Sequence, residues 1–306
     1  MSARTGLGTA EVAVLEALDA LGATSTARYR RSTQVLATIE AAIGLGPRHA
    51  YPLLADLGAP WRLHLPLLDR NGNWGGQGDD GPAEARYTEL RLGRIGELAL
   101  AAERGEVGPV PLGLIEGSLW RGGGVPPFAP TRILAALRTG ADPGPPALPR
   151  GGRLVGDLES LLRGDEVRLE RTCTFVEETN GRGQRQLIIT EVPLGVSTDL
   201  VARQLEGRVL GSRRTMRHVD GSRTPPRNPA PLLDVHDESS GREGIRIVGK
   251  LDDTAGWEEA SAYLRSVWPV TTLVDCRLPA PLTTLLSSWG AGDGSGLDAL
   301  EGLLAS

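Results

Sequence analysis

The stretch LDRNGNWGGQGDDGPAEARYTELRL, residues Leu68 to Leu92, decides how this chain is interpreted. A glycine-rich segment is followed by the adjacent pair Arg86 and Tyr87. Clustered glycines are typical of a loop, so the pair is expected where a loop ends. A tyrosine in such a place is usually a packing residue, and RYTE alone carries no functional information. The residues around it therefore carry the interpretation.

Those residues resemble the active-site segment of type IIA DNA topoisomerase breakage subunits, the family that includes GyrA-type chains of gyrase and their topoisomerase IV counterparts. The family pattern reads roughly VDGQGNFGSxDGDxxAAxRYTExRL, and its tyrosine attacks a DNA phosphodiester. The resemblance implies that Tyr87 is the nucleophile. It also implies that Arg86 supplies positive charge and hydrogen-bond donors to the phosphate.

The resemblance continues along most of the chain, in five segments that keep the family's order. They count against an unrelated α+β domain. The segments are Arg4 to Gly22, Tyr29 to Asp69, Gly124 to Leu137, Leu187 to Val201 and Asp237 to Val248.

Composition limits the kinds of function open to the chain. Its 306 residues, 40% of them hydrophobic, suffice for one large core or two moderate ones. A formal charge of −5 argues against a protein that coats nucleic acid by bulk positive charge, so any DNA site must be a local patch. The two cysteines, Cys173 and Cys276, form no close pair. With no long apolar run and no signal-peptide pattern, we expect a cytoplasmic, nucleoid-associated protein with no membrane partner.

The N-terminal third predicts three short helices. Val12, Leu15, Leu18 and Leu21 form a helical stripe that Gly22 ends. Further helices are expected over 33–43, with Ser32 as N-cap, and over 48–57. Three helices followed by a glycine-rich turn are typical of a winged helix-turn-helix.

The remainder predicts an α+β domain. Residues 140–152 are rich in proline and glycine and are expected to form a loop. Strands are expected over 167–176, 186–191, 245–250 and 271–278, with a turn at 179–183 and a helix over 256–267. We therefore predict the α+β class, with a winged-helix domain over 1–107 followed by an α+β tower domain over 108–306.

Arginines supply the candidate DNA contacts. Near the Arg86–Tyr87 pair these are Arg28, Arg30, Arg31, Arg48 and Arg91. Segment 211–231, which resembles an insertion in the family's tower, adds Arg213, Arg214 and Arg217. Two interpretations of that segment stay open, phosphate contacts and a solvated loop.

Some features depart from the family. GTAEVA (Gly8 to Ala13) replaces KPVHRR, so Glu11 stands where positive charge is expected, and GLGPR (Gly44 to Arg48) replaces HPHGD. The family's N-terminal arm and lower dimer gate have no counterpart in the sequence. Ile115 or Leu119 is the candidate for the family's intercalating wedge.

The resemblance implies a homodimer that acts on double-stranded DNA with a gyrase B-like partner. That partner would supply Mg²⁺ through a Toprim domain and would be the only route to ATP. Two functions stay open. One is a minimal breakage subunit, and the other is a non-catalytic paralogue that binds DNA or one of the gyrase chains.

Overall fold

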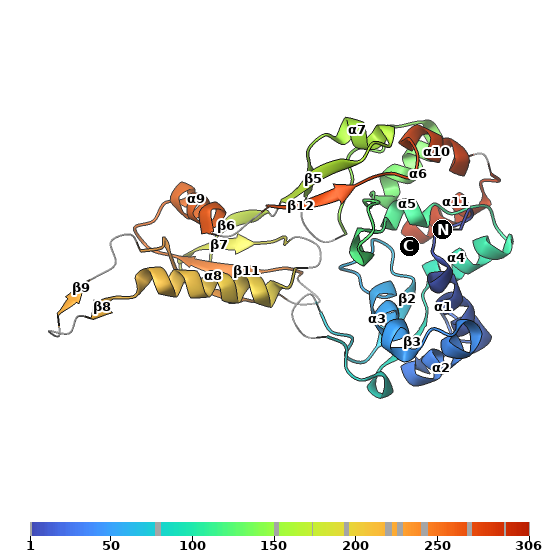
Figure 1. The fold of residues 1–306 in the computed structure, drawn as a ribbon, viewed down its shortest axis with the longest axis horizontal. Coiled ribbons are helices and arrows are strands. Elements are labelled where there is room, and N and C mark those ends of the chain that lie inside the picture. The colour runs from blue at the N-terminus through green and yellow to red at the C-terminus, as the bar shows by residue number, and fades with distance from the viewer. Residues whose placement is uncertain are drawn as a thin grey trace.

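The computed structural model describes residues 2–76, 81–149, 153–172, 174–192, 196–217, 222–224, 229–239, 244–267, 271–290 and 292–305. They form a rounded body and an elongated arm (Figure 1). The body consists of described residues up to 172 and from 271 onward, and the arm of those between 174 and 267. Helices and strands occur in both parts, so the predicted α+β class is confirmed.

The first part of the body holds the three predicted helices, α1 (Thr9–Ala20), α2 (Ser32–Ile43) and α3 (Pro47–Leu57). Val14, Leu18, Val35, Ile39 and Leu54 bury their side chains in the core between these helices and the neighbouring sheet. That sheet has the order β1-β3-β2 and consists of β1 (Arg30–Arg31), β2 (Leu68–Asn71) and β3 (Glu89–Leu92).

The predicted cap of the second helix is wrong by one residue. Arg31 occupies the N-cap position, and no side-chain cap bond is made there. Ser32 is the first helical residue, and its hydroxyl contacts Thr88 across the sheet. A tertiary hydrogen bond has replaced the local cap expected from the sequence.

The rest of the body packs helices against a second sheet. The helices are α4 (Arg94–Arg104), α5 (Leu112–Glu116), α6 (Pro130–Thr139), α7 (Leu158–Arg163), α10 (Leu282–Gly290) and α11 (Ser295–Leu304), with the short 3-10 helix η2 (Leu119–Arg121). The sheet has the order β12-β5-β4, from β4 (Arg153–Val155), β5 (Val167–Thr172) and β12 (Thr271–Cys276). Residues 140–149 carry no helix or strand, as expected for this part of the 140–152 loop.

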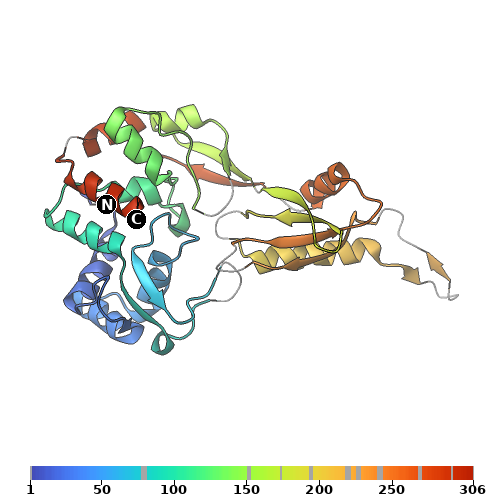
Figure 2. The same cartoon turned by 180° about the vertical axis from the view of Figure 1, so that it is seen from behind.

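The arm is a twisted antiparallel sheet with helices packed against it. Its order is β10-β11-β7-β6, from β6 (Phe175–Thr179), β7 (Arg185–Ile189), β10 (Leu232–Asp237) and β11 (Ile247–Leu251). Leu187 and Ile189, which point to the same face of β7, share a core with α8 (Thr198–Arg213) and α9 (Trp257–Val267). A separate hairpin of β8 (Met216–Arg217) and β9 (Arg223–Thr224) lies at the far end of the arm (Figures 1 and 2).

The arm is inserted into the body, which no sequence pattern had indicated. One buried cluster joins residues from Leu7 to Leu169 with residues from Cys276 to Leu300, and the second runs from Leu187 to Leu264. The predicted boundary at 107/108 therefore falls inside the first core. The predicted strand 167–176 is also two strands, because β5 pairs with β12 and β4 while β6 pairs with β7. The predicted turn at 179–183 joins β6 to β7.

Candidate active site

Tyr87 lies at the end of a 3-10 turn, η1 (Ala85–Tyr87), just before β3. Its amide donates to the carbonyl oxygen of Glu84 at 2.8 Å, which closes the turn. The side chain is 65% exposed, a high fraction for a large aromatic residue. A nucleophile that attacks a macromolecular substrate requires this accessibility.

A buried network fixes the backbone beneath this exposed ring. Thr88 and Ser32 are fully buried, and the Ser32 amide donates to the Thr88 carbonyl at 2.9 Å. The Thr88 hydroxyl lies 2.8 Å from the Ser32 hydroxyl and 2.9 Å from the Tyr51 hydroxyl. Tyr51 also donates to the Ala83 carbonyl. Tyr87 thus stands on a turn that α2 and α3 hold in place.

The glycine-rich segment supports the same turn from the other side. Gly72 has φ +92°, and a Cβ there would lie 2.7 Å from the Tyr87 carbonyl oxygen. Trp74 is buried, with its ring 5.5 Å from that of Tyr51, and its indole N–H donates to the Asn71 carbonyl at 3.0 Å. Sequence reasoning did not single out these supporting residues, although Gly72 and Trp74 lie in the quoted motif.

Arg86 is next to the nucleophile but already has a partner. Its guanidinium lies 4.8 Å from the centre of the Tyr87 ring and 2.8 Å from the Glu84 carboxylate. The Arg86 and Glu84 side chains are 62% and 70% exposed. Such an exposed ion pair contributes at most about 1 kcal/mol, so a phosphate can displace Glu84 at little cost.

The other predicted arginines of the body divide into two groups. Arg28, Arg31 and Arg48 are at least partly exposed. Arg31 pairs in register with Glu89, two residues beyond Tyr87, and Arg48 lies one helical turn before Tyr51.

Arg30 and Arg91 are engaged more deeply. The Arg30 Nε is buried and makes no hydrogen bond. Arg91 donates to Asp69 at 3.0 Å and to the Ala27 carbonyl at 2.9 Å. Much of the Arg91 guanidinium is therefore committed within the protein.

In the arm, Arg213 has a structural role that was not expected. It donates to the carbonyl oxygens of Ala230 and Leu232 and to Asp252, which fastens the end of α8 to β10. This bond holds the pKa of Asp252 at about 2. Arg214 is exposed, and the Arg217 side chain lies outside the described part of the chain.

Two further expectations are changed by burial. Glu11, which stands where the family has positive charge, is buried in an ion pair with Arg121. It therefore does not present a negative charge at the surface. Ile115 is fully buried and does not project as a wedge, whereas Leu119 is only partly buried.

A cavity of about 570 Å³ lies beside the glycine-rich segment, lined by Tyr29, Asp69, Arg70, Asn73 and Trp74 among others. The Arg70 guanidinium lies 4.9 Å from the ring centre of Trp61 and 5.8 Å from that of Trp74. Burial lowers the pKa of Arg70 to about 10, so Arg70 stays charged at neutral pH. Arg70 is thus a structural cation under the site.

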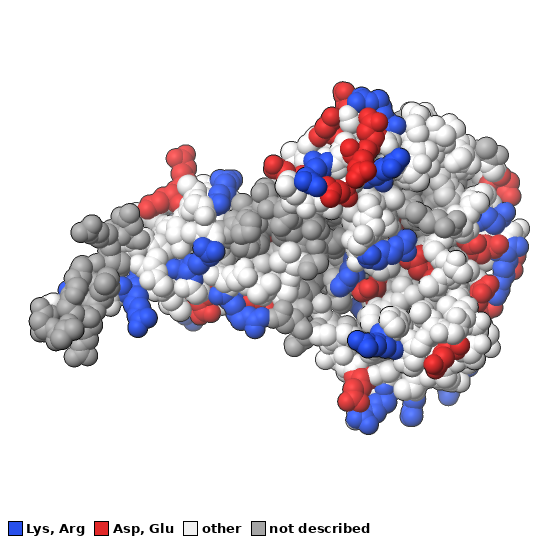
Figure 3. Space-filling view, viewed as in Figure 1, with Lys and Arg blue, Asp and Glu red and all other residues white. Residues whose placement is uncertain are grey.

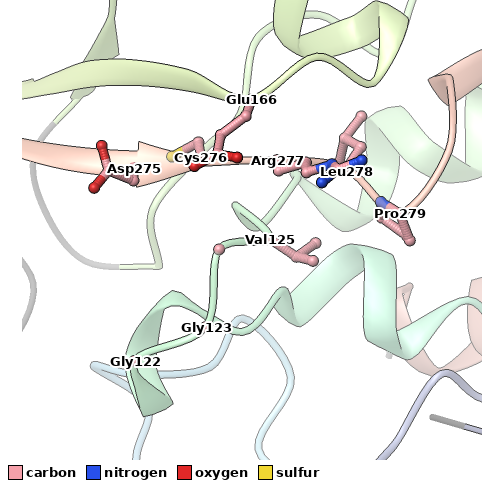
Figure 4. A pocket seen from close by; sticks show the side chains of 10 residues that line it. Gly122, Gly123, Val125, Glu166, Asp275, Cys276, Arg277, Leu278 and Pro279 are labelled. Carbon is pink, nitrogen blue, oxygen red and sulfur yellow. The ribbon is translucent and has the colours of Figure 1, made fainter.

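A second cavity, of about 440 Å³, lies between Gly122–Gly124 and the end of β12 (Figure 4). Asp275, on its wall, pairs with Arg168 at 2.6 Å, and the Arg277 amide donates to the Gly124 carbonyl at 2.8 Å. Figure 1 places β12 at the top of the body and β3, which follows Tyr87, at the bottom. This cavity includes no predicted site residue.

Within the described residues, no three His, Cys, Asp or Glu side chains are arranged to hold a metal ion. We therefore assign no metal ligand to this chain. Among the same residues, no helix has the length and apolar character needed to span a membrane. Acidic and basic side chains are interspersed on the face of the body shown in Figure 3, with no single basic surface.

Comparison with known proteins gives relatives of one kind, the A chains of two bacterial topoisomerases. The chain is 28% identical over 287 residues to the DNA gyrase A chain of Aminobacterium colombiense, which covers 80% of the chain and 33% of that protein. It is 25% identical over 242 residues to the DNA gyrase A chain of Treponema pallidum, covering 67% of the chain and 28% of that protein. It is 25% identical over 301 residues to the DNA topoisomerase 4 A chain of Staphylococcus aureus, covering 85% of the chain and 35% of that protein.

No protein-family model matches the chain. The chain spans about a third of the length of the curated relatives that it matches. The matches nevertheless extend over 67% to 85% of the chain and agree with the motif around Tyr87. The chain is thus a relative of the breakage subunits of type IIA DNA topoisomerases.

Proposed function

We propose that the chain is a DNA-breakage subunit that cleaves duplex DNA through Tyr87. The exposure of Tyr87 on a turn fixed by buried hydrogen bonds is the observation that carries this proposal. The phenol oxygen attacks a phosphorus atom and forms a phosphotyrosine bond. The bond from phosphorus to the leaving deoxyribose oxygen breaks, and that oxygen takes up a proton. The freed hydroxyl reverses the step.

Arg86 stabilises the negative charge that builds up on the phosphate oxygens. In this proposal its guanidinium leaves Glu84, 2.8 Å away, and turns to the phosphate. Arg28, Arg31 and Arg48, with Arg30 and Arg91 behind them, bind the duplex on either side. The helices α1–α3 and their sheet then act as a winged helix, and the arm acts as the tower.

We further propose a homodimer and a partner subunit. The end of α2 presents an uncharged surface of Ala41, Ala42, Ile43 and Gly44, with Ile43 44% exposed. A two-fold contact through this surface would bring two Tyr87 sites onto one duplex. A gyrase B-like Toprim partner supplies Mg²⁺ and the link to ATP. This function implies a cytoplasmic, nucleoid-associated location.

Trapping the covalent intermediate tests the proposal. The chain is mixed with a gyrase B-like partner, Mg²⁺ and DNA, and the reaction is stopped with denaturant. We expect a protein–DNA adduct that Tyr87→Phe abolishes while duplex binding is kept, because only the nucleophilic oxygen is lost. Arg86→Ala should lower adduct formation by about 10²-fold or more.

Tyr263→Phe, on α9 of the arm, is the matched control and should leave the adduct unchanged. Normal duplex binding without an adduct, across several gyrase B-like partners, would contradict the enzymatic function. It would leave the alternative, a non-catalytic paralogue that binds DNA.

A further inference from the structure

The hairpin β8–β9 at the end of the arm is poorly stabilised by the protein itself. It is a two-stranded sheet with only two residue pairs, Met216 with Thr224 and Arg217 with Arg223. None of its described residues belongs to the core of the arm. An isolated two-stranded hairpin is marginal in water, so local pairing alone does not account for it.

Its charge pattern makes the hairpin less stable still. Arg217 and Arg223 occupy directly opposite positions, and like charges in such a pair are destabilising by up to about 1 kcal/mol. Between residues 211 and 231 the sequence has five arginines and one acidic residue, Asp220. Arg214, at the end of α8, and Arg223 are both exposed. A polyanion would remove this repulsion.

The arm also places the hairpin far from Tyr87. Helix α8 has 16 residues, so it is about 24 Å long, which corresponds to about seven base pairs of duplex. The hairpin lies beyond the end of this helix, at the tip of the arm (Figures 1 and 2). A duplex contacted there is a different segment from the one at Tyr87.

We propose that the hairpin β8–β9 is a second DNA-binding element, which contacts the duplex outside the segment bound by the body. A two-stranded ribbon has the width to enter the major groove, where Arg217 and Arg223 would lie between the two phosphate backbones. Arg214 would contact the nearer backbone. This inference rests on the proposed function, because it takes the same duplex as its ligand.

The test compares the affinity of the full chain for duplexes of about 15 and about 50 base pairs at several salt concentrations. For the double variant Arg217→Ser/Arg223→Ser we expect about 10-fold weaker binding of the long duplex. The slope of log affinity against log salt should fall by about two. Binding of the short duplex should not change.

Arg132→Ser/Arg163→Ser, two exposed arginines of the body, is the matched control for the change in charge. It should leave the difference between the two duplexes unaltered. If the hairpin variant binds both duplexes as the wild type does, the hairpin is a solvated loop and the inference is wrong. If the wild type binds neither duplex, the proposed function fails as well, so the two failures are distinguishable.

Discussion

At the scale of single residues, buried polar groups determine where the exposed ones stand. Tyr87 is accessible because Thr88, the next residue, is fully buried and bonded to Ser32 and Tyr51. The motif was enough to predict the nucleophile and its arginine. It could not identify Ser32 as a support, because a serine at that position is equally suited to a local cap.

Glu116 gives a residue-level prediction for the dependence of stability on pH. It is buried and accepts the amides of His64 at 2.7 Å and Leu65 at 2.8 Å. Burial raises its pKa from 4.5 to about 8, against the effect of the two donors. Because the folded-state pKa lies above the unfolded one, the folded protein binds more protons between these values. Its stabilising contribution is complete below pH 4.5 and is lost as the pH rises through 8.

The variant Glu116→Gln should remove this dependence, because glutamine does not titrate. The free energy of unfolding of the variant relative to the wild type should rise by about 2 to 4 kcal/mol between about pH 5 and about pH 9. Urea unfolding at a series of pH values measures it. Glu16→Gln, on the exposed side of α1, is the control. A difference that stays constant with pH would show that Glu116 is already ionised in the folded protein.

At the scale of elements, local patterns located most helices and strands but not their partners. Helix α3 and helix α9 begin within one residue of the predicted positions. The run 167–176 has one composition throughout, yet it supplies β5 to the body and the start of β6 to the arm. Strand pairing depends on distant segments, here β12 and β7, and a continuous run of strand-forming residues does not show where a chain changes sheets.

Glycines in two elements should respond to alanine in opposite directions. Gly207 and Gly211 lie on the exposed side of α8, and a Cβ at either would meet nothing within 4 Å. Because glycine in a helix costs about 1 kcal/mol relative to alanine, Gly207→Ala and Gly211→Ala should each stabilise the arm by about that amount. Gly72→Ala should destabilise by more than about 1 kcal/mol, because of its positive φ and the contact with the Tyr87 carbonyl.

Thermal unfolding of the three variants measures these effects. A loss of stability in both α8 variants would contradict the open environment of these glycines. Wild-type stability of Gly72→Ala would contradict the tight packing beneath the Tyr87 turn.

At the scale of the whole molecule, two cores in one chain separate the chemistry from the reach. The body carries Tyr87 and has its own buried cluster, which residues on both sides of the arm complete. The arm has a second cluster and carries the hairpin at its far end. The predicted division at 107/108 followed the family resemblance. It missed the insertion because the pairing of β5 with β12, which closes the body across the arm, joins segments far apart in the sequence.

That pairing gives the last prediction, because the arm can be replaced by a turn. Thr172 and Thr271 are paired opposite each other at the ends of β5 and β12. A two-residue Asn-Gly turn joins antiparallel strands at such a pair. The chain in which this turn replaces residues 173–270 should fold and unfold in one cooperative transition, since the deletion leaves the core of the body intact.

The shortened chain should bind a duplex of about 15 base pairs as the full chain does, and it should lose the extra affinity for a duplex of about 50. With a functional gyrase B-like partner it should still form the Tyr87 adduct. Circular dichroism, calorimetry and binding to both duplexes provide the measurements. A shortened chain that does not fold would show that the body depends on the arm for its stability. A folded chain that keeps its preference for the long duplex would place the outer DNA contact on the body.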